Sequence, residues 1–223
     1  MRVAALFSGG KDSTFAVHLA QQWGFEVTHL VTLLPRNPES HMFHVPNLRW
    51  TPLLAEAMDI EHVMAKSSGE KERELSDLHR ALSGLRIRGV VSGAVASEYQ
   101  RTRVERVCHE LRVHSYAPLW HKDGSRLVRE LIDAGVDARV VACAAEGLDA
   151  SWLGRRLDPQ ALLDLERLNR EKGVHVSGEG GEYESIVLDA PWFQKRLEIV
   201  ASRPEWQRDS GTLVIQQAEL AAK

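Results

Sequence analysis

A serine- and glycine-rich run near the N-terminus carries the residues best suited to bind an anion. It reads Ser8-Gly9-Gly10-Lys11-Asp12-Ser13, follows the apolar segment Val3–Phe7 and opens an amphipathic helical pattern. Adjacent glycines let the backbone turn its N–H groups toward one point, and a helix that follows adds its positive N-terminal end. Lys11 can hold phosphate as a point charge, the two serines offer hydroxyls, and Asp12 suits bound Mg²⁺. The run therefore predicts a site for a metal nucleotide.

Two common phosphate motifs do not fit this run. The motif Gly-x-x-x-x-Gly-Lys-[Ser/Thr] fails because Ala5 stands at its first glycine and Asp12 at its hydroxyl position. The dinucleotide motif Gly-x-Gly-x-x-Gly fails because Gly9 and Gly10 are adjacent and the next glycine is Gly24. The run instead resembles the Ser-Gly-Gly-x-Asp-Ser loop of the N-type ATP pyrophosphatases. That resemblance implies cleavage of ATP into AMP and pyrophosphate; the alternative is a helix start that merely favours serine and glycine.

A second run combines glycines with carboxylates. It reads Gly178-Glu179-Gly180-Gly181-Glu182-Tyr183-Glu184 and precedes the apolar segment Ser185–Leu188. Glycines let a backbone approach a ligand closely, and Glu179, Glu182 and Glu184 offer oxygens that bind Mg²⁺, bind a cationic substrate or orient an amine nucleophile. The alternative is a solvated acidic turn, because glycine and glutamate are ordinary loop residues.

A third stretch, residues 93–108, leaves a predicted strand and enters a predicted helix. Ser97 is a natural N-cap and Gln100 occupies the capping-box position, so helix initiation explains part of this pattern. We also expect Gly93, Ser97 and Gln100 to border the nucleotide. Arg103 follows near the carboxyl edge of the sheet, where a guanidinium can bind phosphate in bidentate fashion.

A fourth stretch, residues 40–44, contains His41 and His44 in a His-x-x-His arrangement. Such a pair can indicate zinc, but no third ligand stands at a recognisable spacing. We expect instead a loop that shapes the nucleotide or substrate pocket, and we assign His44 to the nucleotide site.

Strand-like and helix-like patterns alternate along the first half of the chain. This alternation predicts a Rossmann-like α/β fold, similar to the adenine nucleotide alpha hydrolases, in which helices cover both faces of a parallel sheet and ligands bind beyond the carboxyl ends of the strands. The rhythm changes after Trp120, so we expect domains at residues 1–120 and 121–223, the second a smaller α/β domain. It is expected to end in an edge hairpin between Leu197 and Gln217. The expected segments are Val3–Phe7, Asp12–Trp23, Val27–Leu34, Thr51–Met58, His62–Ala65, Glu70–Leu82, Val90–Gly93, Ser97–Leu111, His114–Pro118, Ser125–Ala134, Ala138–Ala144 and Pro159–Lys172.

The composition excludes several classes of protein. The 223 residues include 28 basic and 31 acidic side chains, so no overall field attracts nucleic acid or an anionic membrane. Two cysteines, Cys108 and Cys143, are too few for a disulfide framework and too far apart for a Cys-x-x-Cys pair. With no signal sequence and no apolar run of about 18 residues, we expect a cytoplasmic protein.

Taken together, these stretches resemble the diphthine ammonia ligase family over residues 1 to about 195. The most specific marks are the run at 8–13, the helix at 97–108 and the run at 178–184, in this order. The resemblance implies ATP-dependent amidation by ammonium of diphthine, a modified histidine on translation elongation factor 2, giving diphthamide, AMP and pyrophosphate. It also implies an ATP-binding first domain, a second domain that binds substrate, and Mg²⁺ on Asp12.

For this reaction we expect catalytic roles for Lys11, Asp12, Arg103 and the three glutamates of the second run. The trimethylammonium group of diphthine also favours aromatic faces, for which Tyr183, Trp120 and Trp192 are candidates. The lack of a suitable cysteine argues against tRNA thiolation by the same superfamily. The remaining alternatives are an amide ligase for a small metabolite and an ATP sensor without chemistry. Each of these functions is compatible with a homo-oligomer.

Overall fold

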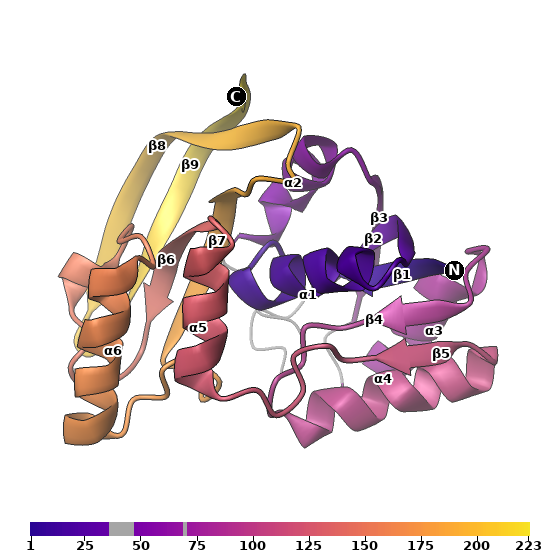
Figure 1. The fold of residues 1–223 in the computed structure, drawn as a ribbon, viewed down its shortest axis with the longest axis horizontal. Helices are drawn as coiled ribbons and strands as arrows, with labels where there is room; N and C mark the ends of the chain where they lie inside the picture. The colour runs from indigo at the N-terminus through magenta and orange to yellow at the C-terminus, as the bar shows by residue number, and fades with distance from the viewer. Residues whose placement is uncertain (36–46, 69–70) are drawn as a thin grey trace. The chain divides into compact units, whose positions relative to one another are not determined.

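The computed structural model describes residues 1–35, 47–68 and 71–223. The chain divides into two compact units, Met1–Trp120 and His121–Lys223. Each unit has its own sheet (Figure 1). The two units are described separately below.

The first unit is built on a five-stranded parallel sheet in the order β3-β2-β1-β4-β5. Its central strand β1 is apolar on both faces, and Val3, Ala4 and Ala5 are at most 1% exposed. Such strands are typical of a parallel sheet covered on both sides. The strands are β1 (Arg2–Leu6), β2 (Glu26–Pro35), β3 (Glu61–Ser67), β4 (Gly89–Val91) and β5 (His114–Tyr116).

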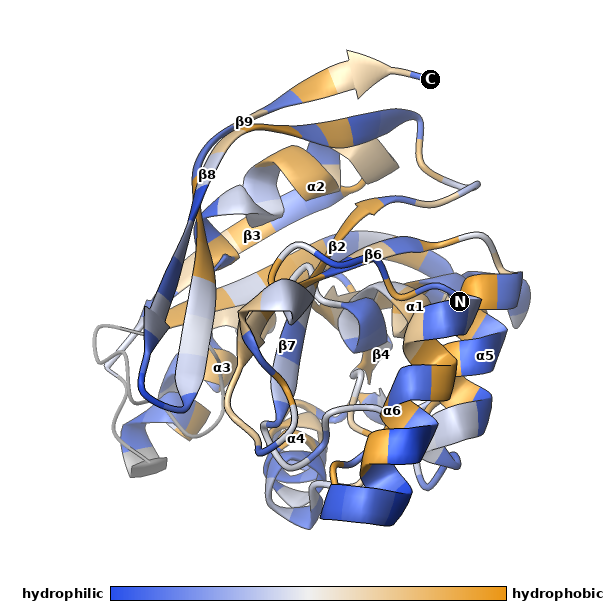
Figure 2. Cartoon of the chain, turned by 90° about the vertical axis from the view of Figure 1, so that its left-hand side faces the viewer, coloured by the Kyte–Doolittle hydropathy of each residue, from blue (hydrophilic) through white to orange (hydrophobic). Residues whose placement is uncertain are grey.

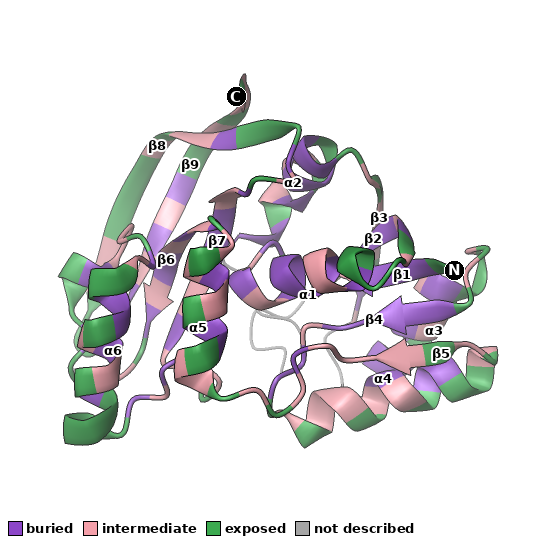
Figure 3. Ribbon diagram, viewed as in Figure 1, coloured by how far each residue is buried: buried purple, intermediate pink, exposed green. Residues whose placement is uncertain are grey.

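Helices cover the sheet on both faces, as the sequence predicts. Ala4 and Val90 point to one face and pack in a core with side chains of α3 and α4. The alternate residues Val3 and Val91 are buried on the opposite face, where α1 contacts β1, β2 and β4. Figure 3 shows the start of α1 as buried and its C-terminal end as exposed. The helical elements are α1 (Lys11–Gln22), the 3₁₀ helix η1 (Leu48–Trp50), α2 (Thr51–Met58), α3 (Lys71–Ser83) and α4 (Glu98–Leu111).

The second unit joins helices to an antiparallel four-stranded sheet in the order β7-β6-β9-β8. Local signals fix its helix α6: Asp158 caps the N-terminus, Pro159 occupies the first turn and Gly173 ends the helix with φ of 74°. In Figure 2, α5 and α6 carry orange and blue segments, as expected of helices with one apolar face. The elements are α5 (Gly124–Asp133), β6 (Asp137–Cys143), η2 (Ala150–Trp152), α6 (Pro159–Lys172), β7 (Tyr183–Asp189), β8 (Lys195–Gln207) and β9 (Ser210–Ala222).

The expected terminal hairpin is present and is longer than its apolar runs suggest. Strand β8 passes through Pro204 without interruption and pairs with β9 from Lys195 to Gln207. Proline is tolerated there because β8 lies at the edge of the sheet, where one row of N–H groups needs no partner strand. No helix in the described ranges is both long and apolar enough to cross a membrane.

Candidate functional site

The predicted phosphate loop connects β1, the central strand, to α1. The Ser8 N–H donates to Ser13 Oγ at 3.2 Å, the two serine hydroxyls lie 3.1 Å apart, and Ser13 Oγ donates to the Gly10 carbonyl at 3.2 Å. These bonds close the loop on itself. Gly10 precedes α1, and no described side chain caps that helix. Its first N–H groups therefore offer an anion the helix-terminal site that a capping side chain would otherwise occupy.

Two glycines allow close packing around this loop. Gly9 has φ of 76°, and a Cβ there would lie 2.7 Å from Leu54 Cδ1 and 3.5 Å from Thr51 Cγ2. A Cβ on Gly93 would lie 2.8 Å from both the carbonyl carbon of Asp12 and the nitrogen of Ser13. The loop is thus bordered by α2 on one side and by the end of β4 on the other. Gly93 was expected to border a ligand, but the close approach of the Asp12 and Ser13 backbone by itself explains a glycine at this position.

Lys11 and Asp12 form an ion pair at the start of α1. Lys11 Nζ lies 2.7 Å from Asp12 Oδ2, and the two side chains are 5% and 26% exposed. The other carboxylate oxygen, Asp12 Oδ1, is buried and has no hydrogen-bond partner among the described residues. Because an unmet buried carboxylate oxygen is costly, it fits a site for a cation or a donor brought by the ligand. Asp12 is therefore compatible with Mg²⁺, whereas no group of three metal-ligating side chains occurs in the described chain.

The side chains predicted on α4 belong to the same unit as the loop. Ser97 caps α4 by accepting the Gln100 N–H at 3.3 Å, which confirms the predicted N-cap. Arg103 is half-buried, and its guanidinium lies 4.5 Å from the centre of the Tyr99 ring. This stacking holds Arg103 by a cation–π contact. A role of Ser97, Gln100 or Arg103 in binding nucleotide stays a prediction, and His44 lies outside the described residues.

The second run forms a tight turn before β7. Gly178 and Gly181 have φ of 76° and 82°, so the turn needs glycine at both positions. Glu182 Oε1 accepts the His175 N–H at 3.0 Å, and Glu182 Oε2 accepts the Gly180 N–H at 2.8 Å. A Cβ on Gly180 would lie 2.7 Å from Glu182 Oε1. Glu182, predicted to act on substrate, therefore holds the turn through both of its carboxylate oxygens.

Two of the aromatic side chains proposed to face a trimethylammonium group are otherwise engaged. Tyr183 is 3% exposed and its hydroxyl donates to the Val176 carbonyl at 2.8 Å. The Arg101 guanidinium lies 4.7 Å from the centre of the Trp120 ring and covers that face. The prediction that Tyr183 offers an open ring face to a cation was wrong, because this side chain is buried. The sequence of the run gives no sign of that burial.

Both cysteines are buried thiols. Burial raises the pKa of Cys108 to about 11 and that of Cys143 to about 12. The thiolate is the reactive form of cysteine, so neither side chain is primed for nucleophilic or redox chemistry near neutral pH. This agrees with the argument from sequence against sulfur transfer.

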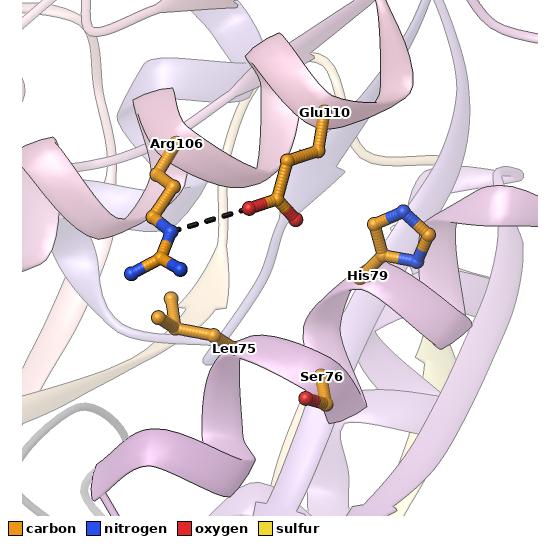
Figure 4. Close-up of a pocket in the computed structure, with 5 residues that line it drawn as sticks. All are labelled: Leu75, Ser76, His79, Arg106 and Glu110. Carbon is orange, nitrogen blue, oxygen red and sulfur yellow. Dashed lines mark hydrogen bonds and ion pairs between the residues drawn. The ribbon is translucent and has the colours of Figure 1, made fainter.

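Two hollows in the described surface, one in each unit, lie apart from the two runs. In the first unit, a shallow cavity of about 310 Å³ between α3 and α4 is lined by Leu75, Ser76, His79, Arg106 and Glu110. Arg106 and Glu110 both belong to α4 and form an ion pair at 3.2 Å along that wall of the cavity (Figure 4). In the second unit, a groove of about 670 Å³ is lined largely by β6, β7 and β8, with Asp137 and Arg139 paired to each other at 2.8 Å. Neither hollow includes a residue of the two runs.

Helix α2 borders the loop, a contact that was not predicted from the sequence. Thr51 and Leu54 lie against Gly9 although more than forty positions separate them in the chain. The signal available was topological: α2 follows β2, a neighbour of β1 in the sheet, and so begins near the same carboxyl edge.

Known proteins resemble this chain over both units. The diphthamide synthase N-terminal domain matches residues 1–115, and the diphthamide synthase C-terminal domain matches residues 123–221. Diphthine–ammonia ligase from Homo sapiens is 34% identical over 245 residues, covering 100% of this chain and 88% of the relative. The Danio rerio protein of the same name is 35% identical over 224 residues, covering 91% of this chain and 88% of its own.

A solved structure, that of a predicted subunit of tRNA methyltransferase from Methanocaldococcus jannaschii, aligns with TM-score 0.46 and 15% identity over 86% of this chain and 98% of its own.

The two domain matches follow the chain in the order of its two units, and the identity to the named relatives extends over nearly their whole length. These matches confirm the family resemblance inferred from the three motifs. The chain belongs to the diphthamide synthase family, whose curated relatives are diphthine–ammonia ligases.

Proposed function

We propose that this protein is an AMP-forming ligase that amidates diphthine with ammonium at the expense of ATP. The observation that carries the proposal is the loop at residues 8–13, where an uncapped helix N-terminus and the ion pair of the buried Lys11 with the partly buried Asp12 meet at the end of the central strand. Such a loop suits a triphosphate and its metal. Membership of the family supports diphthine as the acceptor and ammonium as the source of the nucleophile. By the same reasoning we propose elongation factor 2, which carries diphthine, as the protein partner.

In the reaction that we propose, an oxygen of the diphthine carboxylate attacks the α phosphorus of ATP and the bond to pyrophosphate breaks. Lys11, the helix N-terminus and Arg103 meet the charge that develops on the phosphate oxygens, and this preorganised stabilisation is the main catalytic contribution in such chemistry. Mg²⁺, which Asp12 is suited to hold through Oδ1, would neutralise phosphate charge when bound.

In the second step, ammonium gives up one proton and the resulting ammonia attacks the acyl carbon. AMP leaves with the electrons of its bond to that carbon, and the attacking nitrogen loses a second proton. Glu179 and Glu184 are our candidates to accept that proton or to bind the trimethylammonium group, since both oxygens of Glu182 accept backbone N–H groups. We thus propose that residues of the first unit activate the carboxylate and that residues of the second unit bind the acceptor.

A single incubation tests the proposal. The protein is mixed with ATP, Mg²⁺, ammonium and diphthine-bearing elongation factor 2, and both AMP and the mass of the modified histidine are followed. We expect AMP to form together with the conversion of acid to amide. AMP that forms without the elongation factor would instead support a ligase for a small metabolite, and no AMP under any condition would support a sensor.

The variant Asp12→Asn provides a matched control for the loop, because it keeps the size of the side chain and removes its charge. We expect it to form no AMP and still to unfold cooperatively, with a melting temperature lowered because the buried Lys11 ammonium loses its charged partner. Full activity of this variant would contradict the placement of the metal.

A further inference from the structure

Buried polar atoms without partners are concentrated beside the phosphate loop. Asp12, Thr14, Asn47 and Trp50 each bury a side-chain nitrogen or oxygen that has no hydrogen-bond partner in the part of the chain that is described. Asn47 differs from the others, because both its Oδ1 and its Nδ2 are in this condition and the residue is only 7% exposed.

These residues lie in two segments that are neighbours in space. Asp12 and Thr14 belong to the first turn of α1. Asn47 is the residue that precedes η1, and η1 runs directly into α2, whose Thr51 lies against Gly9 of the loop. Asn47 therefore stands about one helical turn from the contact with Gly9, on the side of the loop away from Gly93 and β4.

A buried primary amide with neither end bonded is unfavourable. Burial removes its hydrogen bonds to water, and the free energy is recovered only if protein or ligand atoms replace them. Native proteins pair the large majority of such groups, so an exception calls for an explanation. A ligand that presents one acceptor and one donor side by side would satisfy both ends of the amide.

We propose that Asn47 reads the adenine base of the nucleotide whose phosphates the loop binds. An asparagine amide matches adenine in bidentate fashion, since its Nδ2 donates to a ring nitrogen while its Oδ1 accepts from the 6-amino group. In open α/β sheets, nucleotides lie across the carboxyl ends of the strands. With the phosphates at the end of β1, a base directed toward the β2 side meets the segment that carries Asn47. This inference rests on the proposed use of ATP.

The test compares the affinity of Mg²⁺-ATP with that of Mg²⁺ and inorganic triphosphate, which has no base, by isothermal titration calorimetry. Asn47→Leu has a similar volume and removes both polar ends. We expect it to weaken ATP binding roughly tenfold or more and to leave triphosphate binding unchanged. We also expect the melting temperature of the ligand-free protein to stay equal or rise, because two unmet polar atoms are gone.

Two further variants keep the test decisive. Asn47→Asp retains the size but offers only acceptors, so ATP binding should fall while triphosphate binding persists, even if the leucine variant does not fold. Asn169→Ala, at an exposed asparagine of α6, should change neither affinity.

The inference is overturned if the Asn47 variants bind ATP as the parent does, or if ATP and triphosphate affinities fall equally, since Asn47 would then act on the phosphates. A parent protein that binds no ATP would instead refute the proposed function, and this inference with it.

Discussion

Glu182 offers the most direct measurement of how the carboxylate-rich turn is built. Its two oxygens accept the N–H groups of His175 and Gly180 at 3.0 and 2.8 Å. A hydrogen bond to a charged group contributes roughly 1.5–3 kcal/mol, and the exposed Gly180 N–H can be rehydrated, so we expect Glu182→Ala to cost about 2–4 kcal/mol of folding free energy. Glu182→Gln should also be destabilising, because its NH₂ group would face a backbone donor.

Denaturant unfolding and amide hydrogen exchange measure this effect. A loss of about 2 kcal/mol corresponds to a roughly 30-fold change in an equilibrium constant, so exchange of the His175 amide should accelerate by at least that factor if it exchanges through local opening of the turn. Glu171→Gln is a matched control, because Glu171 pairs with Arg167 only on the surface of α6, where such pairs contribute about 0.5 kcal/mol or less.

The outcome that would refute this reasoning is a Glu182→Gln variant with unchanged stability and unchanged exchange at His175 and Gly180, but with no ligase activity. Such a variant would show that the carboxylate acts on the substrate and that the turn holds without it. If stability and activity fall together in Glu182→Gln and not in Glu171→Gln, the side chain acts by positioning the turn.

Two other predictions concern the loop and the cysteines. Gly93→Ala places a Cβ 2.8 Å from the backbone of Asp12 and Ser13, which cannot move aside as a flexible side chain would. We therefore expect the folding free energy to fall by about 1–3 kcal/mol and ATP to bind more weakly by calorimetry. An ATP affinity equal to that of the parent would contradict the packing argument. The thiols of Cys108 and Cys143 have folded-state pKa values of about 11 and 12, above the unfolded value of about 8.5, so their contribution to stability is present below pH 8.5 and is lost as the pH rises through 11 and 12. Denaturant unfolding between pH 8 and 11 should show that the folding free energy falls as the pH rises. This fall should be less steep in a double variant, Cys108→Ala with Cys143→Ala. Equal slopes in the parent and the double variant would contradict the contribution of the buried thiols.

The first unit was largely predictable because its signals are local and repeated. Apolar runs such as Val3–Phe7 and Val27–Leu34 alternate with amphipathic segments, and this pattern specifies a parallel sheet with helices on both faces. The bounds of α2 and α6 agree with the expected segments to the residue, since proline stands in the first turn of each and the residue that ends each helix adopts a left-handed conformation.

The second unit was less predictable because its pairings are not local. Nothing near Cys143 in the sequence indicates that β6 lies between β7 and β9, or that β8 continues through Pro204. Antiparallel register depends on which strands meet across a sheet, and strands far apart in the chain do not carry each other's pattern.

The chemical groups that this protein can use were evident in short stretches of its sequence. The loop at 8–13 and the turn at 178–184 are short, contiguous motifs, so their glycines, lysine and carboxylates could be predicted as candidate binding groups from neighbouring residues alone. Which of those groups are already engaged within the protein became evident only from its folded structure. Glu182 is bound to the backbone of its own turn, Tyr183 packs inward, and Gly93 is required by packing against Asp12 and Ser13. Asn47, which no motif marks, keeps both ends of its amide without a partner in the described chain. The physical reason is that hydrogen bonding and burial depend on every atom within a few ångströms, whatever its position in the sequence.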